Sequence, residues 1–343
     1  MNKIEVLGCD DGFDYIKMVA GKGNRLIYPS IYKPYEEVNL GAGFESSSFS
    51  EDNMVLEFED EIYEIGSKAI ESDYSGTKAV KSLRDDKFTE VPEQAKVLAG
   101  IGILAGNEDT EIDLLVHGLS ISSFNQYKRD KDKVYTGKFQ YRAGGKTVTI
   151  KINNATCVAQ GQGAFWDEYL DYKGSQKKET PEGYVGIVDI GGKTVDFFLV
   201  RDTETIGSTA GSLDNGMHKV FSQIAEDNKL PVNKVEYAIW RDKDTVYDDG
   251  NHINIKEKMD QYVEKLAQSI YTKISTTWGE GLRSVEKIFV CGGGAELISP
   301  HLDNLFKSEI SMFENPQFGN AEGYYKLGNI RMQANKTKES KEE

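Results

Sequence analysis

The stretch VGIVDIGGKTVDFFLV, residues 185–200, carries the residue types most suggestive of chemistry. It contains Gly192-Lys193-Thr194, the last three residues of the P-loop that binds nucleotide phosphates. A P-loop also needs a glycine five residues before Gly192 and a helix after the threonine, because backbone N–H groups and a helix N-terminus cradle the phosphates. Ile187 stands at that position, and the β-branched and aromatic residues after Thr194 predict a strand. The stretch therefore predicts a hairpin with a glycine turn and an aspartate at its mouth.

A similar turn lies near the N-terminus, where the sequence GCDDG, residues 8–12, separates two predicted strands. Glycines in such turns let backbone N–H groups approach an anion closely, since no Cβ intervenes. Asp10 and Asp189 would repel a phosphate by themselves, but Mg²⁺ keeps most of its waters and is commonly held through one or two carboxylates. One Asp-x-Gly is more often an ordinary β-turn. A pair, one in each half of the chain, predicts two hairpins that clamp one nucleotide around hydrated Mg²⁺.

A glycine run forms a third candidate element. The predicted strand 287–290 is followed by CGGGAELI, residues 291–298, which includes Gly292, Gly293 and Gly294. Three glycines between a strand and a helix suit a plain tight connection. They also suit a flat backbone surface against which a purine lies at the start of a helix. In order, the chain offers a phosphate hairpin, a second phosphate hairpin and a nucleoside loop.

Both strands and helices are expected around these motifs. The first half shows strands flanking the first turn, a helix near residues 92–104 and a strand at 112–116. The second half shows the hairpin, a long helix near 256–277 and the strand before the glycine run, and the boundary falls near residue 160. The charge run 128–133 is expected to be a solvated loop or helix face. The Lys/Glu/Ser-rich tail, residues 337–343, is expected to be disordered.

Composition narrows the class of protein. At 343 residues two domains are expected, and 38% hydrophobic with 28% charged residues is ordinary for a soluble globular protein. The sequence shows neither an apolar run long enough to span a membrane nor a signal peptide, so we expect a cytoplasmic protein without membrane contact. The three cysteines are widely spaced and are expected to be buried free thiols. The net charge of −15 argues against direct binding of DNA phosphates, so action on DNA would need a basic adaptor.

The three motifs together resemble those of the actin, heat-shock chaperone and sugar-kinase superfamily. Within it they are similar to the bacterial actins of the ParM plasmid-segregation type, and YYKLGN, residues 324–329, resembles the C-terminal helix of that group. The resemblance implies an actin-like α/β fold, in which two domains with related cores flank an interdomain nucleotide cleft. It places domain I at 1–158, with a C-terminal helix at about 320–336 packing back on it, and domain II at 159–319.

The resemblance also implies roles for individual residues. Asp10 and Asp189 would hold Mg²⁺ through its water shell. Asp11, Gly12, Lys17, Gly191, Gly192 and Thr194 would contact the phosphates. Gly292 to Gly294 would flank the adenosine, and Gly216 would precede a helix on the nucleoside side. Lys193 stands where the family commonly has a small residue, and it either adds a cation near the phosphates or points to solvent.

Hydrolysis requires a residue that orients the attacking water, since phosphoryl transfer depends mostly on positioning and electrostatics. Gln160 matches the water-positioning Gln or Glu of the family, and Gln162 is the alternative. Plasmid actins usually have Glu there, so a glutamine favours orientation of the water over general-base chemistry. A polar hinge flanked by glycines is the purely structural interpretation.

The resemblance predicts an ATPase, with GTP as the alternative nucleotide, that assembles into filaments with Mg²⁺ and ATP. Its expected cellular task is plasmid segregation through a DNA-binding adaptor protein. Two alternatives stay open: a non-filamentous actin-fold scaffold of the pilus-assembly or cell-division type, and a small-molecule phosphotransferase. The phosphotransferase would need a catalytic base beside an acceptor pocket, and no such extra motif stands out in the sequence.

Overall fold

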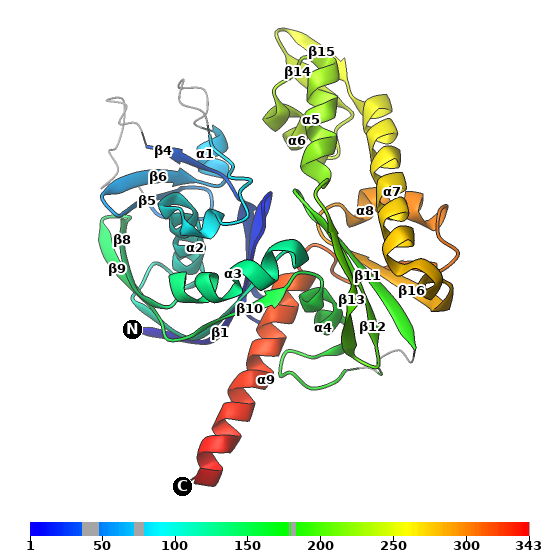
Figure 1. Cartoon of the computed structure of the whole chain (residues 1–343). Helices are drawn as coiled ribbons and strands as arrows, with labels where there is room; N and C mark the ends of the chain where they lie inside the picture. Colours follow the sequence, from blue (N-terminus) through cyan, green and yellow to red (C-terminus); the bar gives the residue numbers. More distant parts are fainter. Residues whose placement is uncertain (36–47, 72–78, 178, 180–182, 343) are drawn as a thin grey trace. The chain divides into compact units, whose positions relative to one another are not determined.

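The computed structural model of the protein describes residues 1–35, 48–71, 79–177, 179 and 183–342, with side chains as far as Thr337. The chain forms two compact units (Figure 1). Unit 1 comprises Met1–Glu179 and Phe318–Glu343, and unit 2 comprises Thr180–Gln317. Each unit contains its own sheet and its own apolar core.

Unit 1 is built on a ten-stranded sheet with the order β3-β2-β1-β7-β9-β8-β5-β6-β4, and β10 pairs with β7. Its strands are β1 Asn2–Asp11, β2 Tyr15–Gly21, β3 Asn24–Pro29, β4 Tyr32–Pro34, β5 Met54–Phe58, β6 Glu61–Ile65, β7 Thr110–Leu119, β8 Gly137–Ala143, β9 Lys146–Ile152 and β10 Ala155–Ala159. Its helices are α1 Ser67–Glu71, the 3₁₀ turn η3 Lys87–Thr89, α2 Val91–Leu104, α3 Ile121–Val134, α4 Gln162–Tyr169 and α9 Gly319–Glu342. Strands β1 and β7 form a parallel pair inside the sheet. Asp10 and Asp11 lie at the carboxyl end of β1.

Unit 2 is built on a five-stranded sheet with the order β13-β12-β11-β16-β17, beside a separate β14–β15 hairpin. Its strands are β11 Tyr184–Ile190, β12 Val195–Arg201, β13 Glu204–Leu213, β14 Thr245–Asp248, β15 Asn251–Asn254, β16 Val285–Cys291 and β17 Glu309–Met312. Its helices are α5 Met217–Asn228, α6 Val232–Trp240, α7 Lys256–Trp278, the 3₁₀ turn η4 Gly279–Ser284 and α8 Ala295–Asp303. Helix α7 is amphipathic, because Val263, Leu266, Ile270 and Ile274 recur at helical spacing and are buried in the core.

The division between the units falls later than the expected 158/159 boundary. Residues 159–179 group with unit 1 because α4 packs closely on α9. A Cβ added at Gly163 would lie 2.6 Å from the Asn320 carbonyl oxygen, so only glycine permits this approach of the two helices. Lys326 of α9 adds a buried ion pair with Asp167 of α4 and donates to the Asp167 carbonyl at 3.0 Å.

Helix α9 continues through the tail to Glu342, and the expected disorder of the tail stays a prediction. Lysine and glutamate favour helix as well as disorder. Extending an existing helix needs no new nucleation, so such residues add turns readily to a helix that is already anchored. The three cysteines are free and buried, as the sequence predicted. Among the described residues, no helix combines the length and the apolar composition needed to cross a bilayer.

Candidate functional site

The expected site residues fall into two groups, one in each unit, and each group forms a local structure of its own. In unit 1, the β1–β2 hairpin pairs Asp10 with Lys17 across its strands. The Lys17 Nζ lies 3.0 Å from Asp10 Oδ2, and both side chains are buried. The sequence predicted both residues as part of one site, and the hairpin register brings their charges into contact.

Gln160 joins the same cluster from the end of β10. Its Nε2 donates to Asp10 Oδ1 at 3.3 Å, while its backbone N–H donates to the Leu119 carbonyl at 2.8 Å. The side-chain amide thereby donates one of its N–H groups to Asp10, and its carbonyl oxygen can act as an acceptor. Gln162, the alternative water-positioning residue, begins α4 after Gly161, whose φ is 83°. Gln160 thus contacts Asp10 directly.

The side chains of Asp10 and Asp11 lie on opposite faces of the sheet, because successive side chains of a strand alternate. Asp11 turns away from the Asp10 cluster, and its Oδ1 accepts from the Lys131 Nζ of α3 at 2.7 Å. Burial alone would raise the pKa of Asp11, but the ammonium groups of Lys131 and Lys87 outweigh it and the pKa is lowered. Conversely, Asp11 raises the pKa of Lys131 against the effect of burial. Asp11 is thus part of a buried ion pair, and any nucleotide contact from it would come from its backbone.

Lys131 is the main residue that the sequence interpretation missed. It belongs to the charge run 128–133, most of which is solvated on α3 as expected, but its own side chain is buried. A helical-spacing signal was present, because Phe124, Tyr127 and Val134 mark one face of α3 and Lys131 lies on that face. The expectation of a solvated run is therefore wrong for this one residue.

In unit 2, the predicted hairpin is confirmed as β11 and β12, joined by a turn at residues 191–194. The Gly191 N–H donates to the Thr194 carbonyl at 2.9 Å and closes the turn. Asp189 pairs in register with Asp196, so the two carboxylates share a face of the sheet, and the Thr194 hydroxyl donates to Asp196 at 3.2 Å. Asp196 occurs in the motif that carried the resemblance, but no role was assigned to it from sequence.

Three carbonyl groups of this turn bond to the N-terminus of α5. Those of Gly191, Gly192 and Lys193 accept from the backbone N–H groups of residues 217, 218 and 216, at 3.1, 2.8 and 2.8 Å. The peptide bonds of the described residues are trans, so each carbonyl points opposite to the next residue's N–H. The amides of residues 192, 193 and 194 consequently face away from α5, as a row of donors. Successive outward amides of this kind form an anion-binding concavity.

Gly216 and Gly292 allow the backbone to pack tightly around this turn. A Cβ added at Gly216 would lie 2.5 Å from both the Gly191 and Gly192 carbonyl oxygens. Gly216 thus packs directly against the turn at residues 191–194, which gives it a structural role whether or not it faces a nucleoside. Gly292 has φ of 88°, and a Cβ there would lie 2.5 Å from Asp189 Oδ1. Gly292 therefore leaves the space that the Asp189 carboxylate occupies.

Gly293 differs from its two neighbours in the glycine run. Gly294 donates to the Ile190 carbonyl at 3.0 Å, and a Cβ on it would lie 2.5 Å from the Ile190 side chain. A Cβ on Gly293 would meet only Trp240 of the described residues, at 3.2 Å and beyond. Gly293 is thus the least crowded member of the run, although a Cβ there would press against the Trp240 ring.

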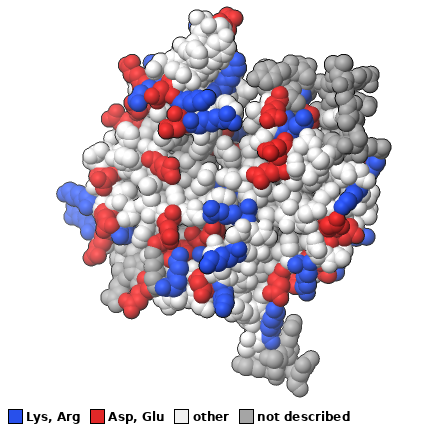
Figure 2. All heavy atoms as spheres, turned by 180° about the vertical axis from the view of Figure 1, so that it is seen from behind, with Lys and Arg blue, Asp and Glu red and all other residues white. Residues whose placement is uncertain are grey.

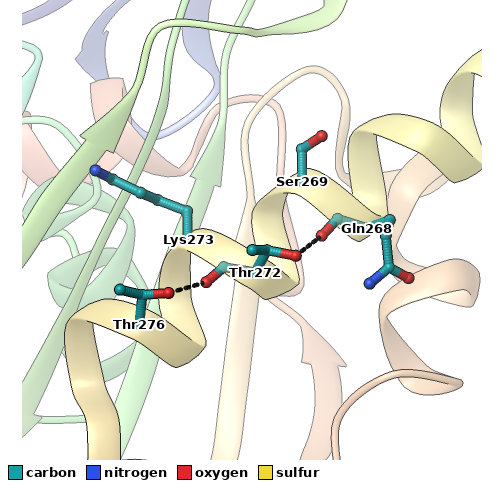
Figure 3. A pocket seen from close by; sticks show the side chains of 5 residues that line it. All are labelled: Gln268, Ser269, Thr272, Lys273 and Thr276. Carbon is teal, nitrogen blue, oxygen red and sulfur yellow. Dashed lines mark hydrogen bonds between the residues drawn. The ribbon is translucent and has the colours of Figure 1, made fainter.

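The polar pocket shown in Figure 3 contains none of the expected site residues. It lies along α7 and is lined by Gln268, Ser269, Thr272, Lys273 and Thr276. The Thr272 and Thr276 hydroxyls donate to the backbone carbonyls four residues earlier, each at 2.8 Å (Figure 3). These hydroxyls therefore bond within their own helix.

Two family sequence models match the chain in succession. The model described as "Actin like proteins N terminal domain" matches residues 8–163. The model described as "Archaeal actin homologue MreB-like, C-terminal" matches residues 187–304. The chain belongs to the actin-like protein family.

Known relatives resemble the chain over nearly its whole length. An archaeal actin homologue from Thermoplasma volcanium is 23% identical over 330 residues, which cover 93% of this chain and 97% of that protein. A 15-stranded ParM filament from Clostridium botulinum gives a TM-score of 0.76 at 22% identity, covering 96% of this chain and 100% of that one. An archaeal actin homologue solved in complex with ADP gives 0.73 at 20% identity, covering 95% and 99%. The expected actin-like α/β fold is confirmed.

Proposed function

We propose that the protein is an actin-like ATPase of the ParM type that assembles into filaments with bound nucleotide. The cluster of Asp10, Lys17 and Gln160 carries this proposal, because it combines a carboxylate, a cation and an amide within hydrogen-bond distance. Phosphoryl transfer needs such positioned charges and a group that orients water, and little covalent chemistry. The ADP bound in one solved relative supports a nucleotide as the ligand.

The residues of each unit supply groups suited to phosphate. In unit 2, the outward amides of residues 192–194 would donate to phosphate oxygens, and the Lys193 side chain would add a cation or extend into solvent. In unit 1, the Lys17 ammonium would contact phosphate from its place beside Asp10. A Cβ on Gly12 would lie 2.8 Å from the Tyr15 carbonyl oxygen, so the turn beside this cluster requires glycine. Gly292, Gly293 and Gly294 would flank the adenosine with their backbone.

The donor set suits Mg²⁺ held through water. Asp10 and Asp189 present hard carboxylate oxygens, and both side chains are nearly buried. In the described part of the chain, no three His, Cys, Asp or Glu side chains gather into a cluster that could hold a metal directly. When bound, Mg²⁺ would neutralise charge on the phosphates. The carboxylates would orient its waters, and Gly292 keeps the space beside Asp189 clear.

Gln160 would position the water that attacks the terminal phosphate. An amide cannot take up the proton as a general base, but its free carbonyl oxygen accepts a hydrogen bond from water. The bond from Nε2 to Asp10 fixes the rotation of the amide and so the direction of that carbonyl. Gln160 therefore acts in this proposal by orientation.

The filament would move plasmid DNA through a separate adaptor protein. The ParM filament among the similar structures supports self-assembly. The net charge of −15 supports an adaptor. On the face seen in Figure 2, Lys and Arg side chains lie among Asp and Glu side chains, an arrangement that does not favour direct contact with DNA phosphates.

Sedimentation and phosphate release on the same sample test this function. With Mg²⁺ and ATP, we expect the protein to pellet, release phosphate and then return to the supernatant. GTP in a parallel sample establishes the nucleotide preference. Nucleotide binding without a pellet would favour the scaffold, and phosphate transfer to an added small-molecule acceptor would favour the phosphotransferase. A protein that binds neither nucleotide would refute the proposal.

A further inference from the structure

Three lysines from three separate segments hold the turn between β1 and β2, residues 11–14. None of them belongs to the site expected from sequence. The contacts are Lys131 Nζ to Asp11 Oδ1 at 2.7 Å, Lys87 Nζ to the Gly12 carbonyl oxygen at 2.9 Å, and Lys81 Nζ to Asp14 Oδ1 at 2.9 Å. The Lys87 contact differs from the other two because it fixes a backbone group of the turn.

Lys87 is buried in η3, just before α2. Besides the Gly12 carbonyl, its Nζ lies 3.4 Å from Glu93 Oε2 and 4.9 Å from the centre of the Phe13 ring. Glu93 is shared with a second buried lysine, Lys96, whose Nζ lies 2.7 Å from Glu93 Oε1. The Glu93 carboxylate thus contacts both Lys87 and Lys96. Of the two polar contacts of Lys87, the one to the Gly12 carbonyl is the shorter.

The bond from Lys87 determines which way the Gly12–Phe13 peptide faces. In a trans peptide the carbonyl and the following N–H point in opposite directions. Because the Gly12 carbonyl points at Lys87, the Phe13 N–H points away from Lys87. A turn with a glycine can otherwise flip this peptide at little steric cost. The lysine therefore selects one of two orientations for an amide beside the Asp10 and Lys17 cluster.

We propose that Lys87 is a positioning residue for phosphate binding, which aims the Phe13 amide at the nucleotide by holding the Gly12 carbonyl behind the turn. This inference rests on the proposed nucleotide site. The turn in unit 1 would then present an amide that points outward. The turn in unit 2 presents its amides in the same way, through its carbonyl bonds to the N-terminus of α5. The two turns then use different anchors, a buried ammonium in one unit and a helix N-terminus in the other.

Lys96 provides a matched control. It is buried on the same network, shares Glu93 with Lys87 and bonds to Ser30 rather than to the turn. Lys87→Met and Lys96→Met each remove one buried lysine amine and leave Glu93 with the other lysine as its partner. A purely structural role for Lys87 predicts similar effects of the two substitutions. A positioning role predicts that only Lys87→Met weakens nucleotide binding.

Titration calorimetry with Mg-ADP, well below the melting temperature of every variant, separates these cases. We expect Lys87→Met to weaken Mg-ADP binding about tenfold or more, as for loss of a charge-assisted hydrogen bond. Lys96→Met should stay within about threefold of wild type, and Lys87→Arg, which keeps a donor, should recover most of the affinity. Equal losses in the two methionine variants, or none in Lys87→Met, would overturn the inference. Wild type that fails to bind Mg-ADP would instead refute the nucleotide site itself.

A measurement on the Phe13 amide tests the inference without altering Lys87, in case Lys87→Met fails to fold. Labelling glycine carbonyls with ¹³C and phenylalanine amides with ¹⁵N selects the Gly-Phe pairs of the chain, of which there are two, Gly12-Phe13 and Gly43-Phe44. Phe44→Leu removes the second signal and assigns the first. Mg-ADP should shift the Phe13 amide resonance, whereas an unchanged resonance at saturating Mg-ADP would overturn the inference.

Discussion

Gln160→Ala should separate nucleotide binding from hydrolysis. The substitution removes one side-chain hydrogen bond, the 3.3 Å contact from Nε2 to Asp10. The backbone bond from Gln160 N–H to the Leu119 carbonyl, 2.8 Å long, remains and holds the end of β10 in place. A single long, half-buried hydrogen bond contributes at most about 1 kcal/mol to the free energy of unfolding. We therefore expect a folded variant with nearly unchanged Mg-ATP affinity.

The effect on hydrolysis should be much larger than the effect on stability. If the Gln160 carbonyl orients the attacking water, its loss removes one contact that is strongest in the transition state. Such contacts are worth up to about 4 kcal/mol, and we expect phosphate release to slow by roughly ten- to a thousandfold. Filaments of the variant should persist, because assembly depends on bound ATP and release depends on hydrolysis.

Phosphate release and sedimentation, followed over time on one sample, measure both effects. Gln162→Ala is the matched control, because Gln162 lies two residues away at the start of α4. It should hydrolyse ATP within about twofold of the wild-type rate. Wild-type turnover in Gln160→Ala would refute the assignment, and slow turnover in Gln162→Ala alone would transfer the role to Gln162.

Three further predictions concern buried or nearly buried charges. Asp189→Asn should reduce hydrolysis at saturating Mg-ATP by at least about tenfold with little change in melting temperature, and a rate within about twofold of wild type would remove Asp189 from the site. Lys131→Met should lower the free energy of unfolding by about 3–5 kcal/mol, because it leaves the Asp11 carboxylate buried without its partner, and adding Asp11→Asn should recover most of the loss in denaturant titrations. Burial, helped by the nearby Lys87, lowers the pKa of Lys96 from 10.5 to about 7, so between these values the unfolded chain binds a proton that the folded chain does not. Stability should then rise with pH by up to about 1.4 kcal/mol per pH unit in that window, and Lys96→Met should flatten the rise measured between pH 7.5 and 9.5.

The motifs were predictable from sequence because their signals are local. The apolar run before Asp189, the paired glycines and the apolar run after Thr194 together specify a hairpin, and the structure confirms it. The glycine run after β16 likewise stands between a strand and a helix, as its composition predicted. Fold class followed from the family resemblance that these motifs carry in their order along the chain, and the actin-like fold is confirmed.

The anchors behind the first turn were not predictable in the same way. Asp10 and Asp11 are adjacent and identical in type, and only the pleat of β1 directs one to Lys17 and the other to Lys131. The Lys131 partner lies 120 residues along the chain from Asp11. Charge composition predicts solvent exposure, and a buried lysine breaks that rule only where a tertiary partner compensates the cost of burial. Helical spacing could place Lys131 on the apolar face of α3, but it could not identify the carboxylate that it meets.

The two glycine turns show how one sequence pattern can be stabilised by different interactions. The turn at residues 191–194 is anchored by backbone groups at the start of α5, and the approach of α5 depends on the missing side chain of Gly216. The turn at residues 11–14 is anchored by lysine side chains that arrive from distant segments. Backbone groups can hold a turn where a glycine allows close approach. A buried ammonium that holds a turn also requires a buried carboxylate to compensate its charge. The buried charges around the turn of unit 1 are therefore tied to how that turn is held: Asp11 pairs with Lys131, and Lys87 lies between the Gly12 carbonyl and Glu93.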